Sequence, residues 1–262
     1  MSKRTDSNLY TVLFAAGMVL VVGSLLAFLA SSLKPTIDEN KRIEKQQNIL
    51  YAMGVNENDE TSAIFVSKDK VADVFSKYIK DQLVLIIENG KVVKKQNREE
   101  YMAENNKQEP YLIDIKKQQT AAKEGKERRL PLFVGEKDGK TFYIAPIRGK
   151  GLWDAVWAYV AMDADMVVQG AYFDHKGETA GLGANIKQRF FMDDFIGEHL
   201  MKDGNFKGIT ISKSNNDPKN EDKTDNEVDA IAGATITGDG VSAMIKTELK
   251  KYVSFFNNLK TN

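Results

Sequence analysis

The sequence predicts an α+β fold, in which a single domain with a central, mostly antiparallel sheet flanked by helices follows an N-terminal transmembrane helix. Strand patterns separated by turn signals dominate the middle of the chain, from residue 83 to residue 173. Helical patterns lie on both sides of them, at residues 36–53 and 241–256. An uncharged run over residues 7–33 precedes all of these elements. Strands grouped together, with helices before and after them, are typical of α+β domains.

The uncharged run is long enough to cross a membrane. Its central part, Thr11–Ala30, is almost wholly apolar, and about 20 helical residues span a hydrocarbon layer roughly 30 Å thick. A cleaved signal peptide is the alternative, with Ala30-Ser31-Ser32 as a weak cleavage site. Because the apolar part of a signal peptide is usually about 7–15 residues long, we favour an uncleaved anchor over residues 11–33.

Positive charges indicate the orientation of this anchor. Lys3 and Arg4 precede it and favour a cytoplasmic N-terminus, residues 1–10. Basic residues also follow the span, at Lys34, Lys41, Arg42 and Lys45, so the charge asymmetry is modest. We expect the main domain to lie outside the cytoplasm.

A helical stalk is expected over residues 34–60. Pro35 is expected to end the membrane span, because proline interrupts helices. The following segment, Thr36–Met53, has apolar residues at helical spacing, and Gly54 is a natural stop. The main domain is then assigned to residues 61–262.

Two hairpins and two further strands are predicted in the middle of the chain. Leu83–Ile87 and Val92-Val93 flank an Asn89-Gly90 turn, and the second hairpin, Leu130–Ile147, turns at Asp138-Gly139. The two further strands, Leu152–Met162 and Met166–Phe173, are apolar on both faces, as expected at the centre of a covered sheet.

The last third of the chain contains short elements and one clear helix. A short helix is predicted over Phe190–Leu200 and a short strand over Gly208–Ser212. The polar run Lys213–Glu227 is expected to be a solvated loop. Apolar residues then repeat every three or four positions from Val241 to Phe256, which predicts an amphipathic helix.

Composition excludes several classes of function. Lys plus Arg and Asp plus Glu both number 37, so no charge bias points to nucleic acid. The sequence has no cysteine, which excludes disulfides, thiolate-ligated Fe–S clusters, cysteine zinc sites and thiol nucleophiles. His175 and His199 are the only histidines, so we expect no metal site, and we expect His175 to serve as a structural hydrogen-bonding residue.

The stretch Asp229–Gly240 is the most informative candidate site. Gly233 and Ala234 leave the backbone beside Thr235 uncrowded, so that a bulky group can approach the hydroxyl. The amino end of the last helix follows, and such ends favour phosphate. A threonine at such a position more often caps the following helix than carries a ligand, so these residues alone favour a capping role for Thr235 or Thr237.

The same stretch resembles the flavinylation motif of the FMN-binding domain family, Asp-x-x-Ser-Gly-Ala-Thr-x-Thr. Here the motif is present as Asp229, Gly233, Ala234, Thr235 and Thr237, with Ala232 in place of Ser and Gly238 where Ser often follows. The resemblance implies that a flavin transferase, which also recognises Asp229, esterifies Thr235 with the phosphate of FMN. A threonine hydroxyl is a weak nucleophile without an adjacent base, so this help from outside the chain is needed.

Two further segments extend the resemblance. Residues 177–185, GETAGLGAN, resemble the Glu-Thr-Pro-Gly-Leu-Gly segment of the family, with Ala180 in place of Pro; the matching residues are Glu178, Thr179, Gly181, Leu182 and Gly183. Residues 146–153, PIRGKGLW, resemble a segment of one branch, the C subunits of sodium-translocating NADH:quinone reductases. On the predicted strand, the side chain of Trp153 lies on the same face as those of Trp157 and Tyr159. It is therefore expected either in the core or against the flavin.

The resemblance covers almost the whole chain and implies a function. It implies an FMN-binding domain that is periplasmic and anchored by one helix to a bacterial inner membrane. Its covalent FMN would relay electrons among the other subunits of a complex that couples NADH oxidation and quinone reduction to Na+ export. The chain would supply no catalytic residue and would be inactive alone. Two alternatives stay open: the G subunit of the related ferredoxin:NAD (Rnf) complex, and a non-catalytic membrane-tethered binding module.

Overall fold

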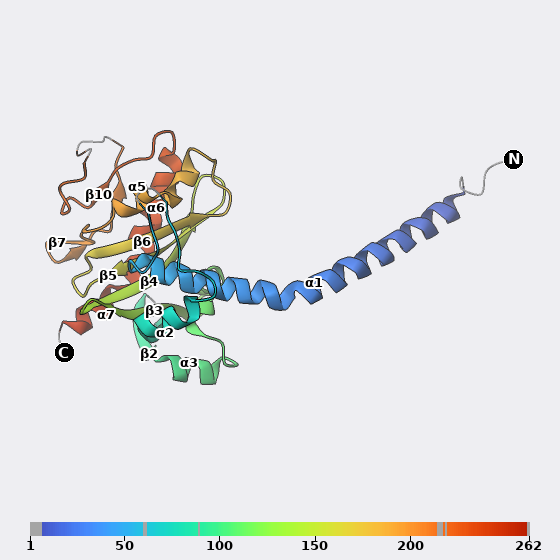
Figure 1. The fold of residues 1–262 in the computed structure, drawn as a ribbon, viewed down its shortest axis with the longest axis horizontal. Coiled ribbons are helices and arrows are strands. Elements are labelled where there is room, and N and C mark those ends of the chain that lie inside the picture. Colours follow the sequence, from blue (N-terminus) through green and yellow to red (C-terminus); the bar gives the residue numbers. More distant parts are fainter. Residues whose placement is uncertain (1–6, 60–61, 89, 214–216, 218, 261–262) are drawn as a thin grey trace. The chain divides into compact units, whose positions relative to one another are not determined.

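The computed structural model describes residues 7–59, 62–88, 90–213, 217 and 219–260 of the 262-residue chain. They form two compact units, Met1–Ile43 and Glu44–Asn262. Figure 1 shows the helices and strands of both units. The candidate site lies in the second unit.

The first helix, α1 (Asn8–Ala52), is continuous, with Pro35 inside it. The prediction that Pro35 ends the helix is therefore wrong. A proline costs a helix one hydrogen bond and about 3 kcal/mol, but helix-forming residues continue on both sides, and an ion pair of 2.7 Å between Lys34 Nζ and Asp38 Oδ2 bridges the proline. An 18-residue window of α1 has a mean hydropathy of 2.6 and no buried residue. By length and composition, this helix is able to span a membrane.

The centre of the second unit is a six-stranded sheet with the strand order β2-β1-β3-β4-β5-β6. Every neighbouring pair in it is antiparallel, which confirms the predicted α+β class. The strands are β1 (Ile79–Glu88), β2 (Lys91–Gln96), β3 (Arg128–Lys137), β4 (Lys140–Lys150), β5 (Ala155–Met162) and β6 (Val168–His175). In the first predicted turn, Asn89 lies outside the described residues, whereas Gly90 has a positive φ of 76°.

The two strands predicted to be covered on both faces are largely buried, as expected. However, β6 lies at the edge of the sheet rather than at its centre. The segment after α5 (Arg189–Asp193) covers this edge: Gly197 N donates to Val168 O at 2.8 Å, and Val168 N donates to Glu198 O at 2.9 Å. This pairing, with an isolated bridge between Val167 and His199, occupies the start of the edge and so limits pairing with another chain there. It also explains why α5 ends before the predicted residue 200.

The last turns of α1 cover one face of the sheet (Figure 1). A Cβ added to Gly170 on β6 would lie 2.3 Å from Ala52 O, and one added to Gly135 on β3 would lie 2.9 Å from Met53 Cε. A side chain at Gly170 would collide with the last residue of α1, and one at Gly135 would collide with Met53, which follows it. These glycines therefore allow the end of the helix to lie directly on the strands. The end of α1 is thus part of the folded domain.

The opposite face of the sheet is covered by α6 (Thr235–Glu248), the short 3-10 helix Leu249–Tyr252 and α7 (Val253–Leu259). The ring of Tyr143 on β4 lies with its centroid 5.9 Å from that of Phe255 and 5.3 Å from that of Phe256. Further along β4, a Cβ on Gly149 would lie 2.7 Å from Met244 Cβ. The predicted last helix is therefore present, and its apolar residues pack against the sheet as its periodicity indicates.

Short elements complete the unit. The helices are α2 (Val71–Tyr78), α3 (Arg98–Glu104) and α4 (Ile115–Lys123), with 3-10 turns at Pro110–Leu112 and Gly183–Lys187; the short strands are β7 (Met201–Lys202), β8 (Asn205–Phe206), β9 (Thr210–Ile211) and β10 (Glu227–Val228). The sequence predicted a strand where β9 lies, but not α3, which begins with a capping box formed by Asn97 and Glu100.

The described part of the polar loop predicted over Lys213–Glu227 is fixed to the segment after α5. Asn220 Nδ2 donates to Asp194 O at 2.7 Å, and Asn226 Nδ2 donates to His199 O. Lys223 Nζ lies 3.6 Å from Oε1 of the fully buried Glu198. Burial raises the pKa of Glu198 to about 7 despite the nearby Lys223. These contacts hold the chain in place just before Asp229.

Candidate functional site

A small cleft opens at the amino end of α6. It has a volume of about 230 Å³, below the roughly 300–1,000 Å³ of pockets that enclose a drug-sized ligand. It can therefore hold part of a cofactor-sized molecule while the rest stays outside. Three segments that are distant in sequence line it: Leu152; Glu178, Thr179, Leu182 and Gly183; and Gly233, Ala234, Thr235, Ile236 and Thr237.

The amino end of α6 has no side-chain cap. Ala234 is the N-cap residue, and Thr235 is the first residue of the helix and exposed. The first hydrogen bond of the helix runs from Gly238 N to Ala234 O at 2.9 Å. The N–H groups of residues 235–237 precede it, so the helix itself gives them no acceptor. The alternative that Thr235 or Thr237 caps the helix is therefore wrong.

Thr237 serves a different purpose. Its side chain is buried, and its Oγ1 donates to Oε2 of Glu178 at 2.5 Å. The other oxygen of that carboxylate, Oε1, accepts from the backbone N–H groups of Trp153 at 3.0 Å and Asp154 at 3.4 Å. Burial alone would raise the pKa of Glu178, but these hydrogen bonds outweigh it and hold the pKa below its usual value. Glu178 is therefore an ionised carboxylate that joins the three segments around the cleft.

Two glycines make this close approach possible. A Cβ on Gly183 would lie 2.5 Å from Thr237 Oγ1, and one on Gly151 would lie 2.6 Å from Glu178 Oε1. Any larger residue at either position would displace the hydrogen-bonded carboxylate. Gly183 of the glycine-rich loop and Gly151 before β5 thus allow the backbone to approach the buried carboxylate of Glu178 closely.

Apolar side chains form an exposed rim around the cleft. Leu152, Leu182 and Ile236 line it and are 43%, 41% and 58% exposed. Trp153 stands beside it, 66% exposed, and its Nε1 donates to Thr179 Oγ1 at 3.1 Å. Three apolar side chains exposed around one opening favour contact with an aromatic or apolar ligand.

The prediction that Trp153 lies on a strand with Trp157 and Tyr159 is wrong. Strand β5 begins at Ala155, and Trp153 lies in the bend before it. The bend forms because the Glu178 carboxylate accepts the N–H groups of residues 153 and 154, which a strand would have paired within the sheet. The indole therefore points outside the core.

The structure brings together most of the residues singled out in the sequence. Eight of them line the cleft, namely Glu178, Thr179, Leu182, Gly183, Gly233, Ala234, Thr235 and Thr237. Gly181 does not line it but shapes its loop with a φ of 76°. His175 plays the expected structural part, because its Nδ1 accepts from Glu178 N at 3.1 Å.

Asp229 lies away from the cleft lining. Its backbone N–H donates to Asp194 Oδ2 at 3.0 Å. Partial burial raises the pKa of the Asp229 carboxyl, and the nearby Asp194 and Asp217 raise it further. The residue is half-buried, six positions before Thr235, at the end of the loop that Asn220 and Asn226 hold.

Two lining residues were not predicted as site residues. Leu152 precedes Trp153 in the glycine-containing segment, and Ile236 lies between the two threonines of the motif. Both residues lie within segments that resemble the family, residues 146–153 and 229–240, so the sequence contains enough information to predict them. No group of three or more His, Cys, Asp or Glu side chains suited to hold a metal ion is found in the part of the chain that the structure describes.

Comparisons with known proteins cover the part of the chain that contains this cleft. Residues 151–250 match the FMN-binding domain family, and this range contains every residue that lines the cleft. Over 267 aligned residues the chain is 30% identical to the C subunit of the Na+-translocating NADH-quinone reductase of Pseudomonas aeruginosa, covering 97% of both chains. It is 28% identical to the same protein of Haemophilus ducreyi, covering 92% of this chain and 89% of that one.

The chain belongs to the family of C subunits of Na+-translocating NADH-quinone reductases. Solved structures of this family share its fold. The crystal structure of the C subunit from Parabacteroides distasonis is 30% identical, with a TM-score of 0.66, covering 86% of this chain and 96% of that one. Shewanella oneidensis NqrC is 25% identical, with a TM-score of 0.61, covering 85% and 99%.

The buried hydrogen bond between Thr237 and Glu178 gives a testable prediction. Thr237→Val leaves a buried carboxylate without one donor and should lower the free energy of unfolding by about 1–3 kcal/mol. Because the folded pKa of Glu178 is depressed, its stabilising contribution is complete above its unfolded pKa and is lost as the pH falls through the folded pKa. The difference between wild type and variant should therefore be largest at neutral pH and smallest in acid.

The measurement is urea unfolding of the full chain in detergent at several pH values. Thr247→Val, on the exposed face of the same helix, is the matched control and should change stability by no more than about 0.5 kcal/mol. Equal effects of the two substitutions would contradict the role given to Thr237.

Proposed function

We propose that this protein carries FMN covalently, as a phosphoester of Thr235, and relays electrons as the C subunit of a Na+-translocating NADH:quinone oxidoreductase. The uncapped amino end of α6 is the observation that carries the proposal. Thr235 is exposed there, in the first turn of a helix whose N–H groups the helix itself leaves without acceptors. A phosphate esterified to this hydroxyl lies next to those donors and to the positive end of the helix dipole.

The surrounding residues suit the rest of FMN. Leu152, Leu182 and Ile236 offer an apolar rim to the isoalloxazine ring, and Trp153 stands next to them. The cleft is too small to enclose the whole cofactor. A covalent bond to Thr235 would keep the flavin in place where burial alone does not.

Among the residues that the structure describes, none beside Thr235 is an evident base for this reaction. Glu178 is a carboxylate of the cleft, but its Oε2 is bonded to Thr237 and its pKa is depressed. It is therefore a weak proton acceptor, and both of its oxygens already accept hydrogen bonds. This argues for a separate flavin transferase that supplies the base and recognises Asp229 before Thr235.

The role in electron transfer follows from family membership and from the flavin. When bound, FMN supplies the ability to accept electrons from one carrier and to pass them to another. The protein binds and orients it at an exposed position, where other subunits of the complex can approach. We infer that this relay is one step between NADH oxidation and quinone reduction, and that the complete complex couples these reactions to Na+ export.

The location proposed is the inner membrane of a bacterium, with α1 as a single-pass anchor and residues 61–262 as a periplasmic FMN-binding domain. The apolar part of α1 has no buried residue in its most hydrophobic window, which a soluble core helix would have. Lys3 and Arg4 before the span favour a cytoplasmic N-terminus.

The attachment site can be tested by substitution. With the transferase present, Thr235→Ala should abolish covalent FMN, because the acceptor oxygen is gone, whereas Thr235→Ser should retain it. Thr237→Ala serves as the control and should keep the cofactor, at a reduced level if the first turn of α6 loosens. Intact mass and peptide mapping are the measurements. FMN mapped to Thr237 would refute the assignment.

The topology can be tested with reporter fusions. Alkaline phosphatase fused to the C-terminus should be active, because that enzyme functions only outside the cytoplasm. A cytoplasmic reporter fused at the same position should be silent. The opposite pattern would reject the periplasmic location and with it the need for flavin attachment outside the cytoplasm.

The relay can be tested in the assembled complex. Thr235→Ala deletes a small exposed side chain, so the fold and the assembly should survive. Membranes with this variant should still oxidise NADH with an artificial acceptor but lose quinone reduction by orders of magnitude, because electrons would have to cross a gap left by the missing flavin. Quinone reduction within a few-fold of wild type would show that this flavin is outside the main path.

A further inference from the structure

A second cavity lies along α6, separate from the cleft at Thr235. It has a volume of about 520 Å³ and opens between α4, the start of β3, the end of β4 and the exposed side of α6. It shares no lining residue with the cleft. Its floor contains small residues, Gly149, Gly240 and Ala243, so space remains between the polar side chains at its walls.

The polar lining of this cavity is strongly basic. Lys123, Arg128, Arg148 and Lys150 line it, and Glu248 is the single carboxylate among its lining residues. Lys123 and Lys150 are exposed. The cavity therefore carries an excess of positive charge that an anion would neutralise.

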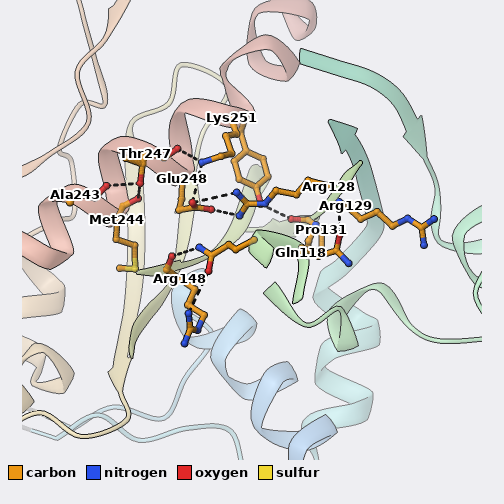
Figure 2. Close-up of polar contacts among 12 residues, drawn as sticks. Gln118, Arg128, Arg129, Pro131, Arg148, Ala243, Met244, Thr247, Glu248 and Lys251 are labelled. Atoms are coloured by element: carbon orange, nitrogen blue, oxygen red, sulfur yellow. Dashed lines mark hydrogen bonds and ion pairs between the residues drawn. The ribbon is translucent and has the colours of Figure 1, made fainter. Parts of the chain in front are cut away.

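The single carboxylate, Glu248, already forms ion pairs with two cations, Arg128 of the cavity lining and Lys251 outside it. Arg128, which is 4% exposed, pairs with both oxygens of Glu248, and Lys251 Nζ lies 3.0 Å from Glu248 Oε1 (Figure 2). Two cations thus share one carboxylate at the base of the cavity. In addition, Arg128 Nε is buried and has no hydrogen-bond partner among the described residues, so one donor of this guanidinium is left unpaired.

Arg148 adds to the excess positive charge of the cavity. Its Nη1 donates to Gln119 Oε1 at 3.4 Å, and Gln119 Nε2 donates to Arg148 O at 2.6 Å (Figure 2). An amide holds this arginine in position but does not neutralise it. The charges of Arg148, Lys123 and Lys150 therefore remain available to a ligand.

We propose that this cavity binds a phosphate-type anion between α4 and α6. Arginine and lysine are the side chains that bind phosphate oxygens, arginine through its planar fork and lysine as a mobile point charge. Four cations around one carboxylate suit a multiply charged anion better than a neutral molecule. Such an anion would connect Lys123 of α4 with Arg148 and Lys150 at the end of β4, over the exposed side of α6.

The anion can come from solution, as free phosphate, or from the headgroup of an anionic phospholipid, because both present the same oxygens. Isothermal titration calorimetry of the full chain in uncharged detergent separates them. One arm uses inorganic phosphate. The other uses dihexanoyl phosphatidylglycerol below its critical micelle concentration, with dihexanoyl phosphatidylcholine as the zwitterionic comparison.

We expect saturable binding in at least one arm, weakened by added salt. Lys123→Gln and Lys150→Gln should each weaken it by about 2- to 5-fold, as expected for exposed charges, and the double variant should weaken it further. Lys116→Gln is the matched control, since Lys116 is exposed on the same helix α4 but does not line the cavity; it should leave affinity unchanged. These variants alter exposed residues, so circular dichroism should show an intact fold.

Absence of saturable binding in both arms would overturn the proposal. It would also be overturned if Lys123→Gln and Lys150→Gln bound with wild-type affinity, or if Lys116→Gln weakened binding equally. Performing the titration in the Thr235→Ala background keeps the test separate from flavin attachment. The outcome for this cavity therefore does not depend on the function proposed for Thr235.

Discussion

The carboxylate of Glu178 is the interaction on which the candidate site depends. It accepts one hydrogen bond from α6 through Thr237 and two from the bend before β5, while Gly183 of its own loop and Gly151 before that bend border it. Ionised groups are buried only when such donors compensate for the lost hydration. The cleft exists because three chain segments must converge to provide these donors, and Thr235 is exposed because Thr237, two residues later, is held inward.

The sheet carries this arrangement because both of its faces are covered. On one face, the end of α1 lies against Gly170, and Met53 directly after it lies against Gly135. On the other face, α6 and α7 lie against Gly149 and Tyr143. The helix that would bear the flavin is thus packed on the rigid centre of the domain. The buried pair between Arg128 and Glu248 fixes the far end of α6 to β3, so both ends of the helix are held by charged groups.

Helix α6 consequently has two chemically different surroundings. At its amino end, N–H donors and an apolar rim suit a phosphate attached to an aromatic ring system. Further along, basic side chains of α4, β3 and β4 surround a cavity over its exposed side. The helix dipole favours anions only at the first of these places, so the second depends on side-chain charge alone and is more sensitive to salt.

The α+β class, the antiparallel sheet, the apolar first helix, the amphipathic last helix and the motif around Thr235 could all be predicted from the sequence, because each depends on local periodicity or on consecutive residues. The prediction was wrong where distant groups compete for the backbone. The Glu178 carboxylate takes N–H groups from residues 153 and 154 and so moves Trp153 out of the strand. Thr237 bonds to Glu178 instead of capping α6, and the helix continues through Pro35. The contacts of Glu178 could not be read from the sequence, because its partners Asp154, Trp153 and Thr237 lie 24, 25 and 59 residues away from it. At Pro35, the helix that continues on both sides outweighs the local preference of proline to interrupt it.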